Sequence, residues 1–115
     1  AVRGRPAVIR WLWAFTFTQV VEVPIYARAL RGRRGRWGWA LLASTLTHPV
    51  VFFLFPRLWP GGYWSQVAAA EAFAVAGEAA LLTALGVPLS ILWAIAANLL
   101  SAGLGLGCRA LLGWP

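Results

Sequence analysis

The sequence predicts an all-α protein, an integral membrane four-helix bundle, and three observations support this fold class. Of its 115 residues, 61% are apolar and only 11% are charged, whereas a soluble domain carries about a quarter charged residues. The mean hydropathy is +0.73. The apolar residues fall into four stretches of roughly 20 residues, the length that crosses about 30 Å of hydrocarbon. A soluble bundle would need polar outer helix faces, and the sequence shows none.

The four stretches are predicted to form one transmembrane domain over residues 1–115. Trp and Arg gather at the ends of the stretches, as expected of side chains that anchor helices at the membrane interface. An Arg/Gly run, a Pro/Gly run and a tight Gly-Val-Pro turn separate them, at Arg31–Arg36, Pro56–Gly62 and Gly86–Pro88. The expected helices cover about 11–30, 37–55, 64–85 and 89–111.

The formal net charge of +7 comes from ten Arg and three Glu. A basic soluble protein would suggest nucleic-acid binding, but no groove-reading element accompanies these Arg, so no nucleic-acid partner is expected. The Arg flank the apolar stretches instead, which is typical of side chains that meet anionic lipid headgroups. The densest group is predicted to contact headgroups: Arg31, Arg33, Arg34 and Arg36. Five Arg fall on each side of the membrane, so the charge rule leaves the orientation open.

Each predicted helix carries one strongly polar residue deep in its apolar stretch: Glu22, His48, Glu78 and Asn98. A charged side chain at the bilayer centre costs about 3 kcal/mol on insertion scales, so such residues mark functional or structural centres. On the first helix, Gln19 and Tyr26 share a face with Glu22. On the third, Glu71 lies two turns, about 10 Å, from Glu78. Pro49 follows His48 and removes a backbone donor, so a local break is expected beside this polar centre.

The second and fourth stretches align without a gap, which indicates an internal repeat. Residues 39–47 lie over residues 93–101, so that Ser44 aligns with Asn98 and Thr47 with Ser101. With a small loop difference, Glu22 of the first helix aligns with Glu78 of the third. The sequence therefore indicates two pseudo-symmetric helical hairpins, related by an axis along the membrane normal. Chance similarity between Ala/Leu-rich helices is the alternative.

Three interpretations of the polar centre remain open at this stage. In the first, Glu22, Glu78, His48 and Asn98 hydrogen-bond across helices and hold the bundle or a subunit interface together. In the second, the two carboxyls relay protons or bind a cation during transport. In the third, the carboxyls and the imidazole bind a divalent metal or catalyse a reaction. No recognisable metal-ligand spacing accompanies them, so the metal is left unknown, no cofactor is expected and no catalytic residue is assigned.

Small residues recur at four-residue spacing on the last two helices, which lets helix backbones approach closely. On the fourth helix they form two faces, one of Ala97, Ser101 and Gly105 and one of Gly103 and Gly107. On the third helix, Ala72, Ala76 and Ala80 form a second kind of face, and Ala70 and Ala74 lead up to Glu78. These faces exceed what one small bundle needs, so a helix of another subunit is expected on one of them.

The polar residues of the last three helices also carry a resemblance. Thr47-His48-Pro49, then Glu71 and Glu78, then Ala97-Asn98-Leu-Leu-Ser101 resemble a pattern of small uncharacterised prokaryotic four-helix membrane proteins. That pattern has Thr-(Asn/His)-Pro on one helix, paired Glu on the next and Ala-Asn-x-x-Ser on the last. The resemblance covers roughly residues 40–107 and leaves out the first helix and the Arg loop. It implies an integral membrane protein with this polar centre and implies no activity.

The sequence thus predicts a non-enzymatic membrane protein whose partners are the lipid bilayer and other membrane subunits or copies of itself. The expected role is an accessory or structural subunit of a larger membrane complex or homo-oligomer. The alternative is a small proton or cation transporter that uses Glu22 and Glu78. An Arg-rich, Lys-free composition is typical of a GC-rich bacterial gene, which favours the bacterial inner (cytoplasmic) membrane.

Overall fold

The computed structural model describes residues 7–113, apart from the side chains of Ala7, Val8 and Trp11. Arg3, Arg5 and Trp114, which are among the Arg and Trp predicted at the membrane interface, lie outside the described residues. The described part is all helical, with six helical elements: α1 (Ala7–Ala29), α2 (Arg36–Leu46), the π-helix η1 (Val50–Leu54), α3 (Phe55–Leu58), α4 (Tyr63–Ala84) and α5 (Ser90–Leu112).

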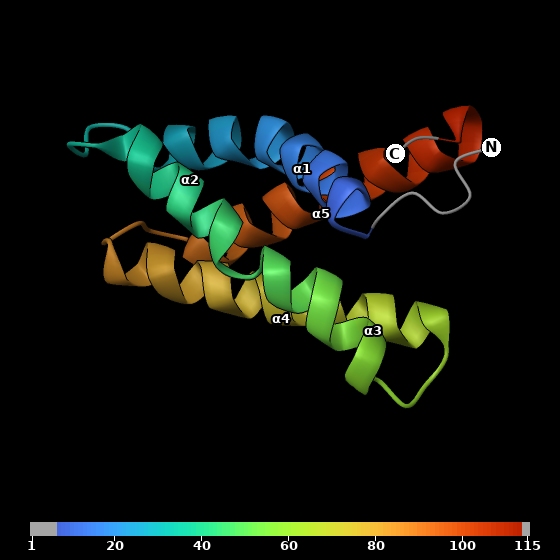
Figure 1. The fold of residues 1–115 in the computed structure, drawn as a ribbon. Helices are drawn as coiled ribbons and strands as arrows, with labels where there is room; N and C mark the ends of the chain where they lie inside the picture. The colour runs from blue at the N-terminus through green and yellow to red at the C-terminus, as the bar shows by residue number, and fades with distance from the viewer. Residues whose placement is uncertain (1–6, 114–115) are drawn as a thin grey trace.

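These elements make four helical rods, because α2, η1 and α3 follow one another with a single kink (Figure 1). The kink lies at Thr47–Pro49, where Pro49 supplies no backbone N–H and the amide of Val51 bonds the carbonyl of Thr47 at 3.0 Å. The break predicted beside His48 is therefore confirmed. A π-helical turn is one of the ordinary ways in which a helix absorbs such a break.

Successive rods run in opposite directions, so that each of the two helical hairpins returns to the end at which it began (Figure 1). The rod ends agree with the predicted ranges to within four residues: the first begins at Ala7 and the second extends to Leu58. The first rod, α1, packs against α2 and α5, and α4 packs against α5 and more lightly against α2. This arrangement places each hairpin beside the other around a common interior.

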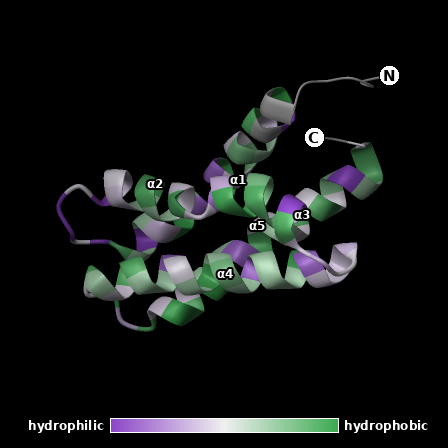
Figure 2. Ribbon diagram, turned by 60° about the horizontal axis from the view of Figure 1, so that its bottom comes forward, coloured by the Kyte–Doolittle hydropathy of each residue, from purple (hydrophilic) through white to green (hydrophobic). Residues whose placement is uncertain are grey.

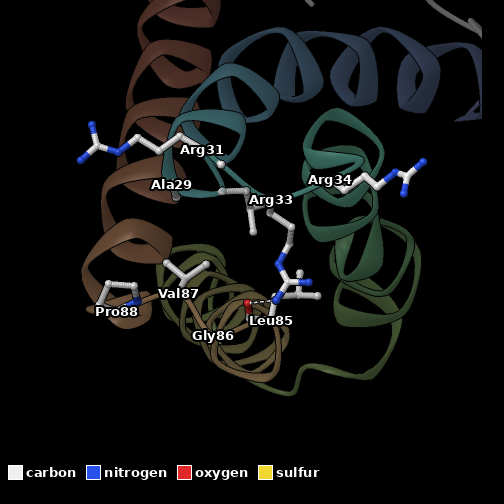
Figure 3. Close-up of a pocket in the computed structure, with 10 residues that line it drawn as sticks. Ala29, Arg31, Arg33, Arg34, Leu85, Gly86, Val87 and Pro88 are labelled. Carbon is white, nitrogen blue, oxygen red and sulfur yellow. Dashed lines mark hydrogen bonds between the residues drawn. The ribbon is translucent and has the colours of Figure 1, made fainter.

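The apolar core is concentrated at the end of the bundle that carries the α1–α2 and α4–α5 loops. Its cluster contains Tyr26, Ala27, Leu30, Ala40, Ala43, Leu82, Val87 and Ala97. Arg33 in the first loop donates to the carbonyl oxygen of Leu85 at the C-terminus of α4, while Arg31 and Arg34 point away on either side (Figure 3). A cation at a helix C-terminus satisfies a carbonyl that has no partner within its own helix. The two loops are thereby tied together.

The outer surface is apolar, as a membrane protein requires. Residues coloured hydrophobic run along most of the helices, and a strongly hydrophilic stretch gathers in the α1–α2 loop (Figure 2). Large side chains such as Val20, Leu99 and Leu112 are 70%, 64% and 75% exposed. The longest dimension is 46 Å, which matches the roughly 40–45 Å of a bilayer with its headgroups.

Three of the four predicted spans are long and apolar enough to cross a membrane: Arg36–Leu58, Tyr63–Ala84 and Ser90–Leu112. The first predicted span is not among them, although α1 has 23 residues. Its length suffices, but Gln19, Glu22 and Arg28 lower its apolar character. Gln19 and Glu22 belong to the polar centre, so the interior chemistry described next accounts for part of this shortfall.

Candidate functional site

Glu22 of α1 and Glu78 of α4 lie in the interior of the bundle and are the most buried of the three carboxyl side chains. Their side chains are 2% and 1% exposed. A buried carboxyl in an apolar helix bundle is tolerated only when its oxygens are hydrogen-bonded. The surrounding helices supply those partners.

The carboxyl of Glu78 accepts three hydrogen bonds. The amide Nδ2 of Asn98 donates to Oε1 at 2.9 Å, and the hydroxyl of Thr47 donates to Oε2 at 2.7 Å. The hydroxyl of Tyr26 also donates to Oε1. Asn98 is held in place because its amide donates to the carbonyl of Ala94 at 2.8 Å. Each of the three helical rods other than α4 therefore supplies one donor to this side chain.

The carboxyl of Glu22 accepts one hydrogen bond at each oxygen. Ser44 donates to Oε1 at 3.0 Å, and Ser101 donates to Oε2. The hydroxyl of Ser101 also lies 3.2 Å from the carbonyl oxygen of Asn98. Glu22 thus joins α1 to both α2 and α5.

The two carboxyls are bound in matching ways. Each takes one donor from the second helix of its own hairpin and one from the second helix of the other hairpin. The own-hairpin donors, Ser44 and Asn98, are the pair that the sequence alignment places over each other. The cross-hairpin donors, Thr47 and Ser101, are the other aligned pair. The pattern of contacts therefore has the same pairing as the alignment.

A small cavity of about 100 Å³ lies between the two carboxyls. At about 30 Å³ per water molecule, it has room for roughly three waters. Glu71 of α4 and His48 also line this cavity. The His48 ring packs edge-on against Phe15 with centroids 5.4 Å apart and stacks with Phe52 at 6.3 Å. The structure therefore brings three carboxyls and one imidazole to the same interior space.

Gln19 and Glu71 differ from the rest of the predicted polar centre because they have buried atoms without partners. Both amide atoms of Gln19 and the Oε2 atom of Glu71 are buried and have no hydrogen-bond partner among the described residues. Such atoms are uncommon in folded proteins and call for an explanation. Gln19 lies outside the small cavity, whereas Glu71 is at its edge.

The small-residue faces divide into inner and outer ones. Ala97 and Ser101 are 0% and 8% exposed, and a Cβ at Gly105 would lie 3.6 Å from the Phe17 ring, so this face packs inside the chain. Gly103 and Gly107 are different, since a Cβ at either would meet no atom within 4 Å. The face of Ala97, Ser101 and Gly105 is thus an inner one, separate from the open face of Gly103 and Gly107 on the same helix.

The sequence did not specify which side chains donate to the two carboxyls. Ser101 was assigned to a helix-packing face and to the polar residues of the fourth helix, and it donates to Glu22. Ser44 and Thr47 were not placed in the polar centre, although their alignment with Asn98 and Ser101 was the signal that could have found them. Thr45, by contrast, bonds the carbonyl of Leu41 at 2.7 Å in its own helix and takes no part.

No group of three or more His, Cys, Asp and Glu side chains suited to a metal ion occurs in the part of the chain that the structure describes. Compared with protein-family models, with curated proteins and with solved structures, the chain matches none of them. The resemblance to small prokaryotic four-helix proteins therefore stays a prediction. The site must be interpreted from its own geometry.

Proposed function

We propose that this chain is a non-enzymatic, small polytopic membrane protein that acts as a structural subunit of a larger membrane assembly, built with copies of itself or with other membrane proteins. The bacterial inner membrane is the proposed location. The division of the small-residue faces into inner and outer ones is the observation that carries this proposal.

Two outer faces are available for a neighbouring helix. On α4, Ala72, Ala76 and Ala80 are all exposed. On α5, Gly103 and Gly107 have open space where side chains would lie. In a bilayer, helices associate through close packing of small residues because lipid tails are as apolar as Leu. Faces of this kind on two adjacent helices support an intermolecular contact.

The carboxyl network supports a complementary, internal role. Every oxygen of Glu22 and Glu78 accepts a bond from a donor of this same chain. Because no oxygen needs a donor from another subunit, we propose that the network sets the register of the two hairpins and leaves subunit contacts to the outer faces. The matching donors also support two hairpins of common plan.

A direct test is purification from native membranes in mild detergent, followed by native gel electrophoresis and mass spectrometry. We expect a defined homo-oligomer or a stoichiometric membrane partner. Gly103→Leu or Ala76→Leu should dissociate it, because a branched side chain separates the helix backbones. Gly38→Leu is the matched control, since Gly38 is also exposed with open space around it. A monomer without partners, or an assembly indifferent to both outer-face variants, would refute the proposal.

One observation favours a second candidate function, transport of protons or a small cation. The cavity between Glu22 and Glu78 reaches Glu71, and Glu71 also lines two wider cavities at one end of the bundle. Towards the other end, Tyr26 and Leu82 are 0% exposed and close the interior. A transporter would have to open that end. In liposomes, ion flux that Glu22→Gln and Glu78→Gln abolish would support transport, and flux unaffected by both variants would exclude it.

A further inference from the structure

The bundle is splayed at the end where α1 begins and α5 ends (Figure 1). Two cavities of about 360 and 490 Å³ lie at this end, within the roughly 300–1,000 Å³ that small-molecule sites occupy. They form one groove, because both are lined by the same residues of α1, η1, α4 and α5: Arg10, Phe52, Val67, Glu71 and Arg109. This space is named the Arg10–Arg109 groove.

The lining of the Arg10–Arg109 groove combines three kinds of chemistry. Arg10 and Arg109 are exposed and line both cavities, and the exposed Arg57 lines the second one, so the groove has three guanidinium groups. Phe52 and Val67 supply apolar walls. Glu71 supplies a buried carboxyl oxygen that has no hydrogen-bond partner among the described residues. A ligand that fits all three needs an anionic group, hydrocarbon and a hydrogen-bond donor.

The order of these groups along the bundle further defines the ligand. Arg10 lies in the first turn of α1 and Arg109 in the last turn of α5, so both are at the membrane interface. Glu71 is eight residues beyond Tyr63, the first residue of α4, which is about 12 Å along the helix axis. The donor must therefore reach deeper into the groove than the anion.

We propose that the Arg10–Arg109 groove binds the headgroup of a phospholipid that carries a primary ammonium group. Its phosphate lies between the guanidinium groups of Arg10 and Arg109, and an ammonium N–H donates to the carboxyl of Glu71. Guanidinium groups bind phosphate through paired, charge-assisted hydrogen bonds. A choline headgroup has no N–H to donate, and a glycerol headgroup has no positive charge, so the ethanolamine headgroup is the best match. This binding site goes beyond the role as an assembly subunit.

The proposal is tested by lipid titration of the purified full chain, with native mass spectrometry as the readout. The probes are phosphatidylethanolamine, phosphatidylglycerol and phosphatidylcholine with identical acyl chains. We expect phosphatidylethanolamine to bind tightest. Arg109→Ala should weaken its binding about tenfold, since a hydrogen bond to a charged group contributes about 1.5 kcal/mol or more. Glu71→Gln should remove most of the preference over phosphatidylglycerol, because the carboxyl selects the ammonium group.

Arg34→Ala is the matched control, because Arg34 is an exposed Arg at the opposite end of the bundle. It should change binding less than twofold. Tryptophan fluorescence and gel filtration establish that each variant is folded before its binding is compared. Equal binding of the three lipids would overturn the proposal, as would a preference that survives Glu71→Gln. A loss in Arg34→Ala as large as in Arg109→Ala would show that surface charge alone attracts the lipid.

Discussion

Replacing Glu78 by Leu should destabilise the bundle by an amount that follows from its three bonds. The substitution leaves the donors of Tyr26, Asn98 and Thr47 without their acceptor. All three donors are buried, at 0–4% exposure, so water does not easily replace the lost partner. The Asn98 amide can keep a partner, because it also lies 3.4 Å from the hydroxyl oxygen of Tyr26. At about 0.6 kcal/mol for an interhelical hydrogen bond in a membrane protein, the other two bonds amount to about 1 kcal/mol.

Replacing Glu22 by Leu should cost less. Ser44 loses its acceptor, but Ser101 can keep one because its hydroxyl lies 3.2 Å from the carbonyl oxygen of Asn98. One lost bond corresponds to about 0.6 kcal/mol. Both variants also remove a buried carboxyl and its desolvation cost, and this contribution is similar for the two sites. The difference of about 0.6 kcal/mol between the variants is therefore the more reliable quantity, with Glu78→Leu the less stable.

Gln variants separate loss of the bonds from loss of the acid. In Glu22→Gln, the new amide can donate to Ser101, whose hydroxyl then turns to the carbonyl of Asn98. In Glu78→Gln, the new amide oxygen can keep the bonds from Tyr26 and Asn98. The N–H of the same amide can donate to the hydroxyl oxygen of Thr47. Both Gln variants should therefore recover most of the stability that the Leu variants lose.

The measurement is unfolding by sodium dodecyl sulfate from detergent micelles, followed by the fluorescence of the eight Trp residues. The free energies of unfolding should rank wild type and the Gln variants highest, then Glu22→Leu, then Glu78→Leu. A Glu22→Leu variant as unstable as Glu78→Leu would refute the bond count. Gln variants no more stable than the Leu variants would refute the hydrogen-bonding account and show that the ionised acid itself is required.

Three further substitutions test close approach and backbone strain. Gly77→Ala should destabilise by about 1–3 kcal/mol, because its Cβ would lie 2.8 Å from the methyl group of Thr47 and displace a donor to the network. Gly38→Ala, where nothing lies within 4 Å, should instead raise stability by up to about 1 kcal/mol through helix propensity; the same unfolding assay distinguishes them. Leu89 has a φ of 56° before α5, so Leu89→Gly should raise the unfolding free energy by about 1 kcal/mol, and an unchanged or lower value would contradict the strain.

The positions of the helices could be predicted from the sequence because the signals are local. Arg/Gly and Pro/Gly runs end the apolar stretches, and Pro49 marks the kink where it occurs. The central place of Glu22 and Glu78 followed from depth alone, since helix rise fixes how far each lies from the interface. The internal repeat also pairs the donors of these two carboxyls, because Ser44 aligns with Asn98 and Thr47 aligns with Ser101.

The contacts between hairpins could not be predicted in the same way. The bond from Tyr26 to Glu78 crosses from one hairpin to the other, and it depends on how each helix is rotated about its axis. Apolar periodicity fixes that rotation in soluble bundles, but a helix surrounded by lipid is apolar on every side, so the pattern is weak. Because the periodicity is weak, the sequence also did not predict that Gly103 faces outward or that a groove lies beside Glu71.

The two ends of the bundle and its centre differ in what stabilises them, and this links the lipid site to stability. The closed end relies on packing around Tyr26 and on the bond from Arg33, and the centre relies on the carboxyl network. At the splayed end the Arg10–Arg109 groove opens between the helices, so a bound lipid supplies contacts that the chain lacks there. A ligand at 100 times its dissociation constant stabilises the folded state by about 2.7 kcal/mol. Adding phosphatidylethanolamine should therefore raise the unfolding free energy of the wild type and of Glu78→Leu by similar amounts, but raise that of Glu71→Gln much less. An equal rise in all three would mean that the lipid acts on the bundle without using Glu71.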